Sequence, residues 1–198
     1  MWRGTDRLLR LITPATELAV TLEDAKAHLR VEDSESDALI TAYIGAAQGQ
    51  LSYLGRAFKP ASYALDMTTF LDRVELPIAP VKGITAIKAR DYSGTQTTVA
   101  TSDYSLFVRA NGIGEVRLAS GQDWPSIRGD LGSASIEFTA GYDTVPDELR
   151  AAVLLITGRL FDERTDSTPS VGRGQVRGSL PILGPVDNLV AHLRVPGV

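Results

Sequence analysis

The spacing of apolar residues divides the chain into helical and β-type stretches. Between residues 35 and 54, apolar side chains recur three and four positions apart, the period of one face of an α-helix. A shorter helix is expected over residues 22–30, because Thr21 can cap its first turn and Asp24 completes a capping box. Gly55 follows the last periodic residue of the longer helix and is expected to close it in the left-handed conformation.

Residues 60–142 follow a different pattern. Thr, Val, Tyr and Ile become frequent, the apolar period falls toward two, and turn residues recur about every 8 to 12 positions. The pattern predicts a β module with hairpin turns at residues 91–94 and at Asn111-Gly112. The predicted strands are Tyr63 to Thr69, Val74 to Leu76, Ile84 to Arg90, Thr97 to Ala100, Tyr104 to Val108, Glu115 to Leu118 and Ser133 to Thr139.

A second helical stretch follows the β module. Pro146 suits the first turn of a helix, and the two acidic residues after it favour the positive end of the helix dipole, so a long helix is predicted over residues 146–164. Gly158 inside it costs about 1 kcal/mol relative to Ala, unless close packing requires a small residue there. Residues 165–185 are rich in Gly, Pro and Ser and predict a loop, and a short helix is expected over residues 186–193.

These elements predict an α+β fold. The helices on either side of the β module lack partners for their apolar faces and are expected to pack together. We therefore predict a small antiparallel bundle of three to four helices, built from residues 1–58 and 143–198, with an antiparallel β domain inserted as residues 59–142.

Composition excludes several classes of protein. The 198 residues are 43% hydrophobic and 22% charged, which suffices for a good core. The net charge of -4 argues against a protein that holds nucleic acid by neutralising phosphates. Of the 20 basic residues, 16 are arginine, which suits ion pairs with carboxylates at protein interfaces but is equally explained by genome base composition. The chain has no cysteine, and neither a signal peptide nor a membrane span is predicted, so we expect a soluble, unsecreted protein.

Few residues suggest a chemical site. His28 and His192 are far apart in the sequence and have no neighbouring ligands at metal-binding spacing, so no metal, cofactor or catalytic residue is predicted. Gly172-Arg173-Gly174 lacks the preceding strand and the following Gly-Lys-Ser/Thr of a phosphate-binding loop.

The β module leaves one alternative function open. Its carboxylates could supply an acid–base pair of the kind that glycosidases use, and Trp124 could be either an exposed anchor or a plug at one end of the β core. A carbohydrate-binding or carbohydrate-processing module would require a concave site with an aromatic platform and paired carboxylates. The carboxylates in question are Asp66, Asp72, Glu75, Asp123 and Asp130.

Nine short segments between residues 22 and 164 occur in a specific order. They are Leu22 to Val31, Asp37 to Ile40, Ala46-Ala47, Leu54 to Phe58, Leu76 to Val81, Asp103-Tyr104, Phe138 to Tyr142, Pro146 to Ala152 and Phe161 to Arg164. Each segment alone is a weak signal, but together and in this order they resemble the head-tail connector (adaptor) proteins of tailed phages, in the longer variety that carries an inserted β domain. The match becomes poorer after Arg164.

The resemblance implies a structural protein that catalyses no reaction. It would form a ring of about twelve subunits beneath the portal of a capsid, with a tail-side stopper or tail terminator protein on the other side. DNA would pass through the lumen without specific binding, and the ring would be assembled in the host cytoplasm and located in the virion neck. A phage, a prophage and a gene transfer agent are equally compatible with the sequence.

Seven residues are candidates for contacts in such an assembly. The candidates for subunit interfaces are Arg56, Gly158, Glu163 and Arg164. The candidates for portal contacts are Arg173 and Arg177, which lie in the Gly-rich loop, together with Arg194.

Overall fold

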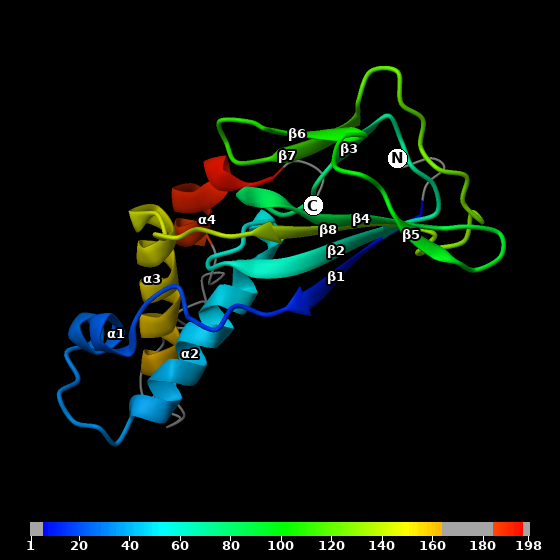
Figure 1. The fold of residues 1–198 in the computed structure, drawn as a ribbon. Coiled ribbons are helices and arrows are strands. Elements are labelled where there is room, and N and C mark those ends of the chain that lie inside the picture. The colour runs from blue at the N-terminus through cyan, green and yellow to red at the C-terminus, as the bar shows by residue number, and fades with distance from the viewer. Residues whose placement is uncertain (1–5, 164–183, 196–198) are drawn as a thin grey trace, which may run out of the picture. The chain divides into compact units, whose positions relative to one another are not determined.

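The computed structural model describes residues 6–163 and 184–195 (Figure 1). Backbone contacts divide the chain into two compact units. The β unit comprises the described parts of residues 1–16, 55–143 and 195–198, and the helical unit comprises those of residues 17–54 and 144–194. The predicted α+β class is confirmed, whereas the domain limits proposed from the sequence stay predictions.

The helical unit is a small bundle in which α3 contacts all three other α-helices. Thr21 caps the first helix as predicted, since its side chain accepts a hydrogen bond of 3.1 Å from the Asp24 amide. The apolar stripes of α2 and α3 are buried, with Ile44 and Leu149 fully inaccessible. The elements are α1 (Leu22–Leu29), α2 (Asp37–Gln50), a 3-10 turn (Ser52–Leu54), α3 (Asp147–Glu163), α4 (Gly184–Val190) and a second 3-10 turn (Ala191–Leu193).

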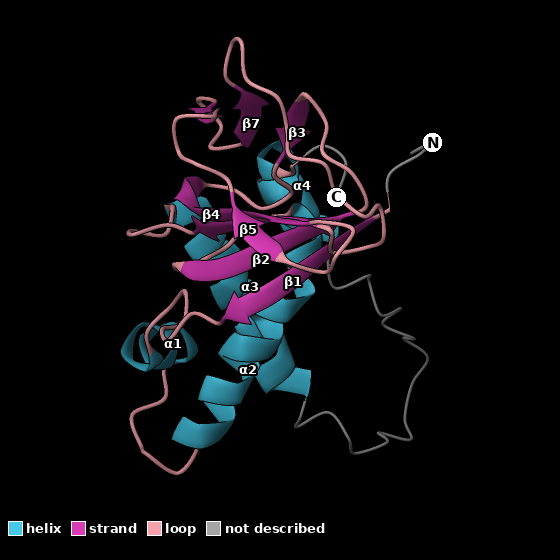
Figure 2. Cartoon of the chain, turned by 45° about the vertical axis from the view of Figure 1, so that its right-hand side comes forward, coloured by secondary structure: helices cyan, strands magenta, loops and turns pink. Residues whose placement is uncertain are grey.

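The β unit contains two antiparallel sheets (Figure 2). The five-stranded sheet has the order β1-β2-β8-β4-β5 and the three-stranded sheet the order β3-β7-β6. Hairpin glycines Gly94 and Gly112 have positive φ angles of 86° and 81°, as the predicted turns require. The strands are β1 (Arg7–Thr13), β2 (Ala61–Met67), β3 (Arg73–Glu75), β4 (Val81–Arg90), β5 (Gln96–Thr98), β6 (Tyr104–Val108), β7 (Gly114–Leu118) and β8 (Ala134–Ala140).

Alternating side chains of the two sheets form the core of the β unit. Leu65 of β2 and Ile136 of β8 pack with Val74 and Val116, which come from β3 and β7. Trp124 acts as a plug at this core, since its ring stacks on Phe70 at 4.5 Å and its indole N–H donates to the Leu71 carbonyl at 3.2 Å. Of the two roles considered for Trp124, the structure supports packing in the core.

Strand β1 was not predicted from the sequence. It pairs antiparallel with β2, from Arg7 opposite Met67 to Leu11 opposite Tyr63. Its sequence places apolar residues on both faces, so the period of two that identifies a half-buried strand is missing. The sequence predicted strands only within the β module, so this strand was missed.

Candidate functional site

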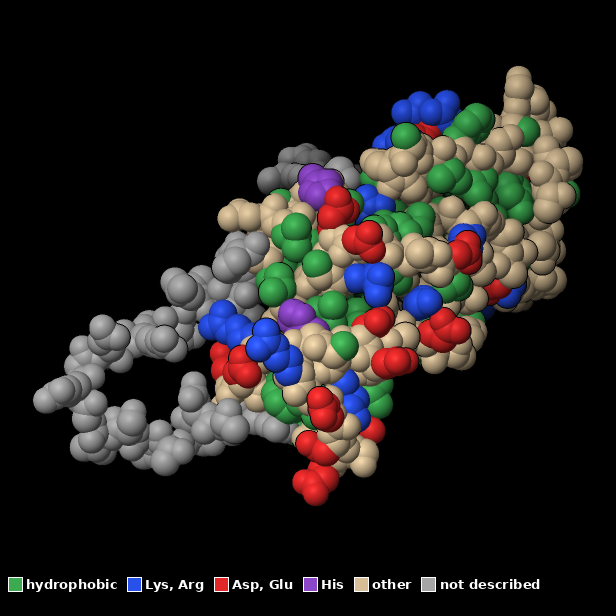
Figure 3. Space-filling view, turned by 90° about the vertical axis from the view of Figure 1, so that its left-hand side faces the viewer, with side chains coloured by type: hydrophobic (Ala, Val, Ile, Leu, Met, Phe, Trp, Pro, Cys, Tyr) green, Lys and Arg blue, Asp and Glu red, His purple; other side chains and the backbone are tan. Residues whose placement is uncertain are grey.

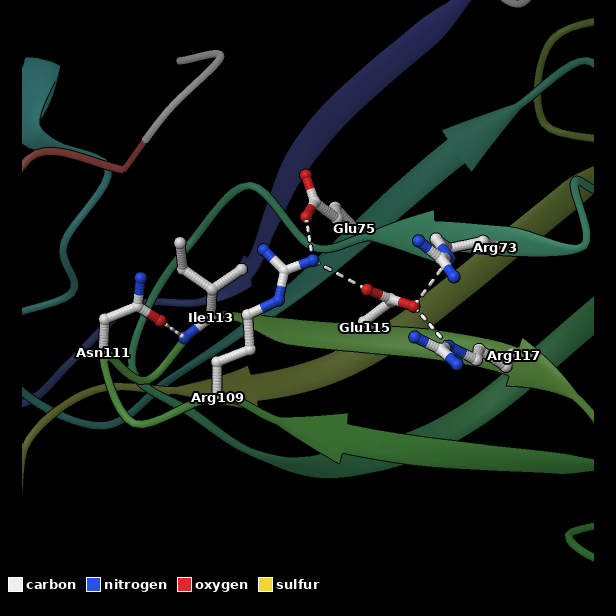
Figure 4. A network of polar contacts seen from close by, with 7 residues as sticks. All are labelled: Arg73, Glu75, Arg109, Asn111, Ile113, Glu115 and Arg117. Carbon is white, nitrogen blue, oxygen red and sulfur yellow. Dashed lines mark hydrogen bonds and ion pairs between the residues drawn. The ribbon is translucent and has the colours of Figure 1, made fainter.

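A network of charged side chains covers the outer face of the three-stranded sheet (Figure 4). Strand register places Glu115 opposite both Glu75 and Phe107, and Arg117 opposite Arg73. The intervening residues of these strands face the core, so the charged residues occupy the opposite face of the sheet.

Glu115 is the centre of this network and is only 2% exposed. Arg73 Nε lies 2.9 Å from Glu115 Oε1, and Arg109 Nη2 lies 2.8 Å from Glu115 Oε2. Arg117 also donates to Glu115, and Arg109 reaches Glu75 at 2.5 Å. Three guanidinium groups thus face two carboxylates, which leaves one positive charge in excess.

The arginines determine the protonation of Glu115. Hydrogen bonding from Arg117 lowers the pKa of Glu115, burial opposes this effect, and Arg109 lowers the pKa further. The carboxylate is therefore ionised and fully occupied by its partners, and it is unsuited to proton transfer. The network can instead hold three arginine side chains in fixed positions at the surface.

Phe107 adds an aromatic ring to this charged surface. The Arg117 guanidinium lies 5.0 Å from the centre of the Phe107 ring, and the ring is 51% exposed. Arginine and aromatic side chains are enriched at the energetically dominant positions of protein interfaces. The outer face of the three-stranded sheet therefore has the composition of a protein contact surface.

The face of the five-stranded sheet that carries Asp66 is polar and bears an open cavity of about 210 Å³. Arg10 Nε lies 2.5 Å from Asp66 Oδ2, Ser135 donates to Asp66 Oδ1 at 2.6 Å, and Lys88 Nζ lies 2.5 Å from Glu137 Oε1. Burial alone would raise the pKa of Asp66, but the hydrogen bonds from Arg10 and Ser135 outweigh it and the pKa is lowered.

This cavity does not match the carbohydrate alternative. Both of its carboxylates are ion-paired, and none of the described residues that line it is aromatic. A sugar-binding site would need an aromatic platform, and a sugar-processing site would also need a carboxyl group with a raised pKa. The lining residues are Arg10, Asp66, Lys88, Ala89, Arg90, Gln96, Leu131, Gly132, Ser135 and Glu137.

Arg56, predicted at a subunit interface, is 8% exposed. Its guanidinium donates to the Asn111 carbonyl at 2.6 Å and to the Tyr142 hydroxyl at 3.4 Å. Because Asn111 lies in the turn between β6 and β7, these bonds stabilise the position of that hairpin within the β unit. The structure therefore gives Arg56 a role within the chain, and a contact with another subunit stays a prediction.

The other described candidates lie in the helical unit. Gly158 is half-buried, and a Cβ atom there would meet His28 Nε2 at 3.5 Å, an ordinary contact. Packing among the described residues therefore does not require glycine at this position. Glu163 accepts from Arg159 at 2.9 Å, and Arg194 is exposed. The remaining candidates, Arg164, Arg173 and Arg177, lie outside the described residues.

The network around Glu115 was not predicted from the sequence. A signal was present, because β3 reads Arg73-Val74-Glu75 and β7 reads Glu115-Val116-Arg117. Two such charged–apolar–charged triplets, paired antiparallel, place all four charges on one face. Arg109 could not have been added to them from the pattern, because it lies beyond the end of β6.

Residues 6–163 and 184–195 contain neither a candidate metal site nor a candidate membrane span. In these ranges, no group of three or more His, Cys, Asp or Glu side chains is placed to hold a metal ion. No helix in the same ranges is both long and apolar enough to cross a membrane.

Comparison with known proteins gives a consistent result. Residues 19–108 match the family model described as phage gp6-like head-tail connector protein. A chain from the virion of a native gene transfer agent (GTA) particle is 27% identical, with a TM-score of 0.73, over 96% of this chain and 97% of that chain. A chain from the neck of an empty GTA particle, computed with C6 symmetry, is 23% identical, with a TM-score of 0.74 and the same coverage. No curated protein sequence matches the chain significantly.

Proposed function

Because the chain is a head-tail connector protein of the tailed-phage type, we propose that identical copies of it form a closed ring in the neck of a phage or phage-derived particle. The ring joins the capsid to the tail and continues the channel for DNA. The observation that carries this proposal is the match to the GTA virion chain over 96% of the present chain, which includes both the β unit and the helical unit.

Symmetry supports a ring of about twelve subunits. The similar neck of an empty GTA particle was computed with C6 symmetry, and another similar structure, the neck of a native GTA particle, was computed with C12 symmetry. A ring of identical subunits requires a heterologous contact, in which two different surfaces of each copy meet and the rotation between copies closes. The portal is the proposed neighbour on the capsid side, and a stopper or tail terminator protein is the proposed neighbour on the tail side.

The charge of the chain suits a channel that passes DNA without holding it. With a net charge of -4, the subunit lacks the overall excess of cations that phosphate binding requires. Acidic and basic side chains are interspersed on the molecular face drawn in Figure 3. Weak affinity allows DNA to move along the lumen.

The proposed role requires no chemical reaction. Glu115 in the charged network and Asp66 in the cavity are both ion-paired with arginine, so neither carboxylate is free to transfer a proton. We propose instead that Gly158 and the charged residues Glu163 and Arg164 lie at subunit contacts, and that Arg173, Arg177 and Arg194 contact the portal.

Deletion of the gene in a host that produces the particles tests this function. Cells without the gene should accumulate DNA-filled heads that carry no tails, and expression of the wild-type chain from a plasmid should restore tailed particles. An empty plasmid is the control. Normal numbers of tailed, DNA-filled particles in the deletion strain would contradict a connector role.

A further inference from the structure

Strand β1 carries an unusual concentration of exposed apolar side chains. Every residue after Arg7 in this strand is exposed. Isolated exposed leucines are common at protein surfaces, but a run of them on one strand marks an interaction site. The exposed fractions are 47% for Leu8, 37% for Leu9, 55% for Leu11 and 44% for Ile12.

The backbone of β1 is also available for pairing. Among residues 6–163 and 184–195, strand β1 is the outermost strand of its sheet, and the Asp6 carbonyl accepts from the Thr68 amide at 3.3 Å. Since backbone groups of an antiparallel pair alternate in direction, the N–H and C=O groups of Leu9 and Leu11 point away from β2. An extended segment of another chain could bond to these groups.

The usual protections of an edge strand are weak here. Natural sheets blunt their edges with lysine, proline or a bulge. Residues 7–13 contain neither lysine nor proline, and the one irregularity lies at the far end, between Leu11 and Thr13. Of the two arginines in this strand, Arg7 lies at its start and Arg10 is paired with Asp66 of β2. A free subunit would therefore expose an edge prone to association, and a permanent contact would cover it.

The opposite edge of the same sheet offers a second surface. Strand β5 forms that edge, and its three residues, Gln96–Thr98, are all exposed. Tyr92, in the hairpin that leads into β5, is 75% exposed, and Leu131, which lines the cavity beside Gln96, is 48% exposed. Four successive antiparallel pairings give β1 and β5 the same direction.

We infer that the β1 edge of each copy packs against the β5 edge of the next copy, so that the five-stranded sheet continues from subunit to subunit around the ring. This inference rests on the proposed ring. A heterologous contact needs two different surfaces on opposite sides of a subunit, and the two edges of one sheet satisfy that condition. Permanent interfaces between identical subunits are also more apolar than transient contacts, which favours a second copy over another neck protein.

Site-specific photo-crosslinking tests the identity of the neighbour. A photoreactive benzoylphenylalanine at position 11 is introduced into the chain, and assembled particles are purified and irradiated. The expected product has twice the 21.2 kDa mass of the chain, with crosslinked peptides from residues 90–99 or around Leu131. A product that contains the portal or a tail protein, or no product from particles with intact necks, would overturn the inference.

A charge placed on the edge provides a second test. Leu11→Glu would bury a carboxylate in the contact and should reduce incorporation into particles by about tenfold or more. Leu39→Glu is the matched control, because Leu39 is also an exposed leucine, 37% accessible, but lies on α2. Circular dichroism establishes that both variants fold. Normal incorporation of folded Leu11→Glu would overturn the inference, whereas absence of the wild-type chain from particles would overturn the proposed function itself.

Discussion

The Tyr53 hydroxyl donates a hydrogen bond to the carboxylate of Asp187, 134 residues further along the chain. Tyr53 lies in the 3-10 turn after α2, and Asp187 lies in the first turn of α4. Burial and, after it, this hydrogen bond raise the pKa of Tyr53 to about 12. The bond ties the last helix to the end of α2 within the helical unit.

The first prediction concerns this bond. Tyr53→Phe should lower the free energy of unfolding by about 0.5–1.5 kcal/mol at neutral pH, since the hydrogen bond is lost and Asp187 keeps access to water. Because the pKa is raised from 10.0 to about 12, the stabilisation by Tyr53 is complete below pH 10 and is lost as the pH rises to about 12. Urea unfolding at pH 8 and pH 11 should show this loss in the wild type. If Tyr53→Phe lost the same unfolding free energy between pH 8 and pH 11, the loss could not be assigned to ionisation of Tyr53.

The second prediction concerns Glu115. Its pKa is lowered, so its contribution to stability is present above its ordinary pKa near 4.5 and declines as the pH falls below that value. Glu115→Gln should lower the melting temperature at pH 7, because three arginines then share one carboxylate. The variant should also lose less stability than the wild type when the pH is lowered. Thermal unfolding at pH 7 and pH 3 measures both effects.

Glu75→Gln is the matched control for Glu115. The side chain of Glu75 is 46% exposed and its ion pair with Arg109 is solvated, so its replacement should change stability less. Equal effects of the two substitutions would show that Glu115 is not the centre of the network.

The third prediction concerns Gly141, which follows β8. Its φ angle is 135°, and a Cβ atom there would lie 2.2 Å from the Lys59 carbonyl oxygen. Gly141→Ala should therefore destabilise the β unit by about 2 kcal/mol or more. Gly83→Ala is the control, since no atom lies within 4 Å of the added Cβ, and it should leave stability unchanged or raise it by about 0.4–1 kcal/mol. Similar melting temperatures for the two variants would contradict the close approach of Gly141 to the Lys59 carbonyl.

The fourth prediction separates stability from assembly at Gly158. Gly158→Ala should raise the free energy of unfolding by up to about 1 kcal/mol, because the helix gains a better residue and the added Cβ makes only ordinary contacts with His28. If Gly158 contacts a neighbouring subunit, the same substitution should reduce incorporation into particles. Increased stability with unchanged incorporation would remove Gly158 from the subunit interface.

Local sequence signals predicted much of the fold. The cap at Thr21, the turns at Gly94 and Gly112, and the helix after Pro146 each depend on a few neighbouring residues, and the structure confirms them. Strand β1 depends instead on pairing with β2, roughly 50 to 60 residues away, and its exposed apolar residues give no alternating pattern. A strand of this kind cannot be recognised from its own residues.

The candidate contact residues were harder to predict than the fold. Arg56 was chosen from its place in a matched segment, yet its guanidinium is occupied by Asn111, a partner that only tertiary structure reveals. The arginines around Glu115 were missed because their common face follows from the register of β3, β7 and β6. Side-chain convergence of this kind depends on register, which the sequence pattern did not specify.

The most direct measurement is electron microscopy of the purified chain mixed with the portal protein of the same gene cluster, compared with the chain alone. The connector function predicts rings stacked coaxially on portals, with about twelvefold symmetry in averaged images. Portals that remain bare at every salt and protein concentration tested, while the chain stays folded, would contradict it.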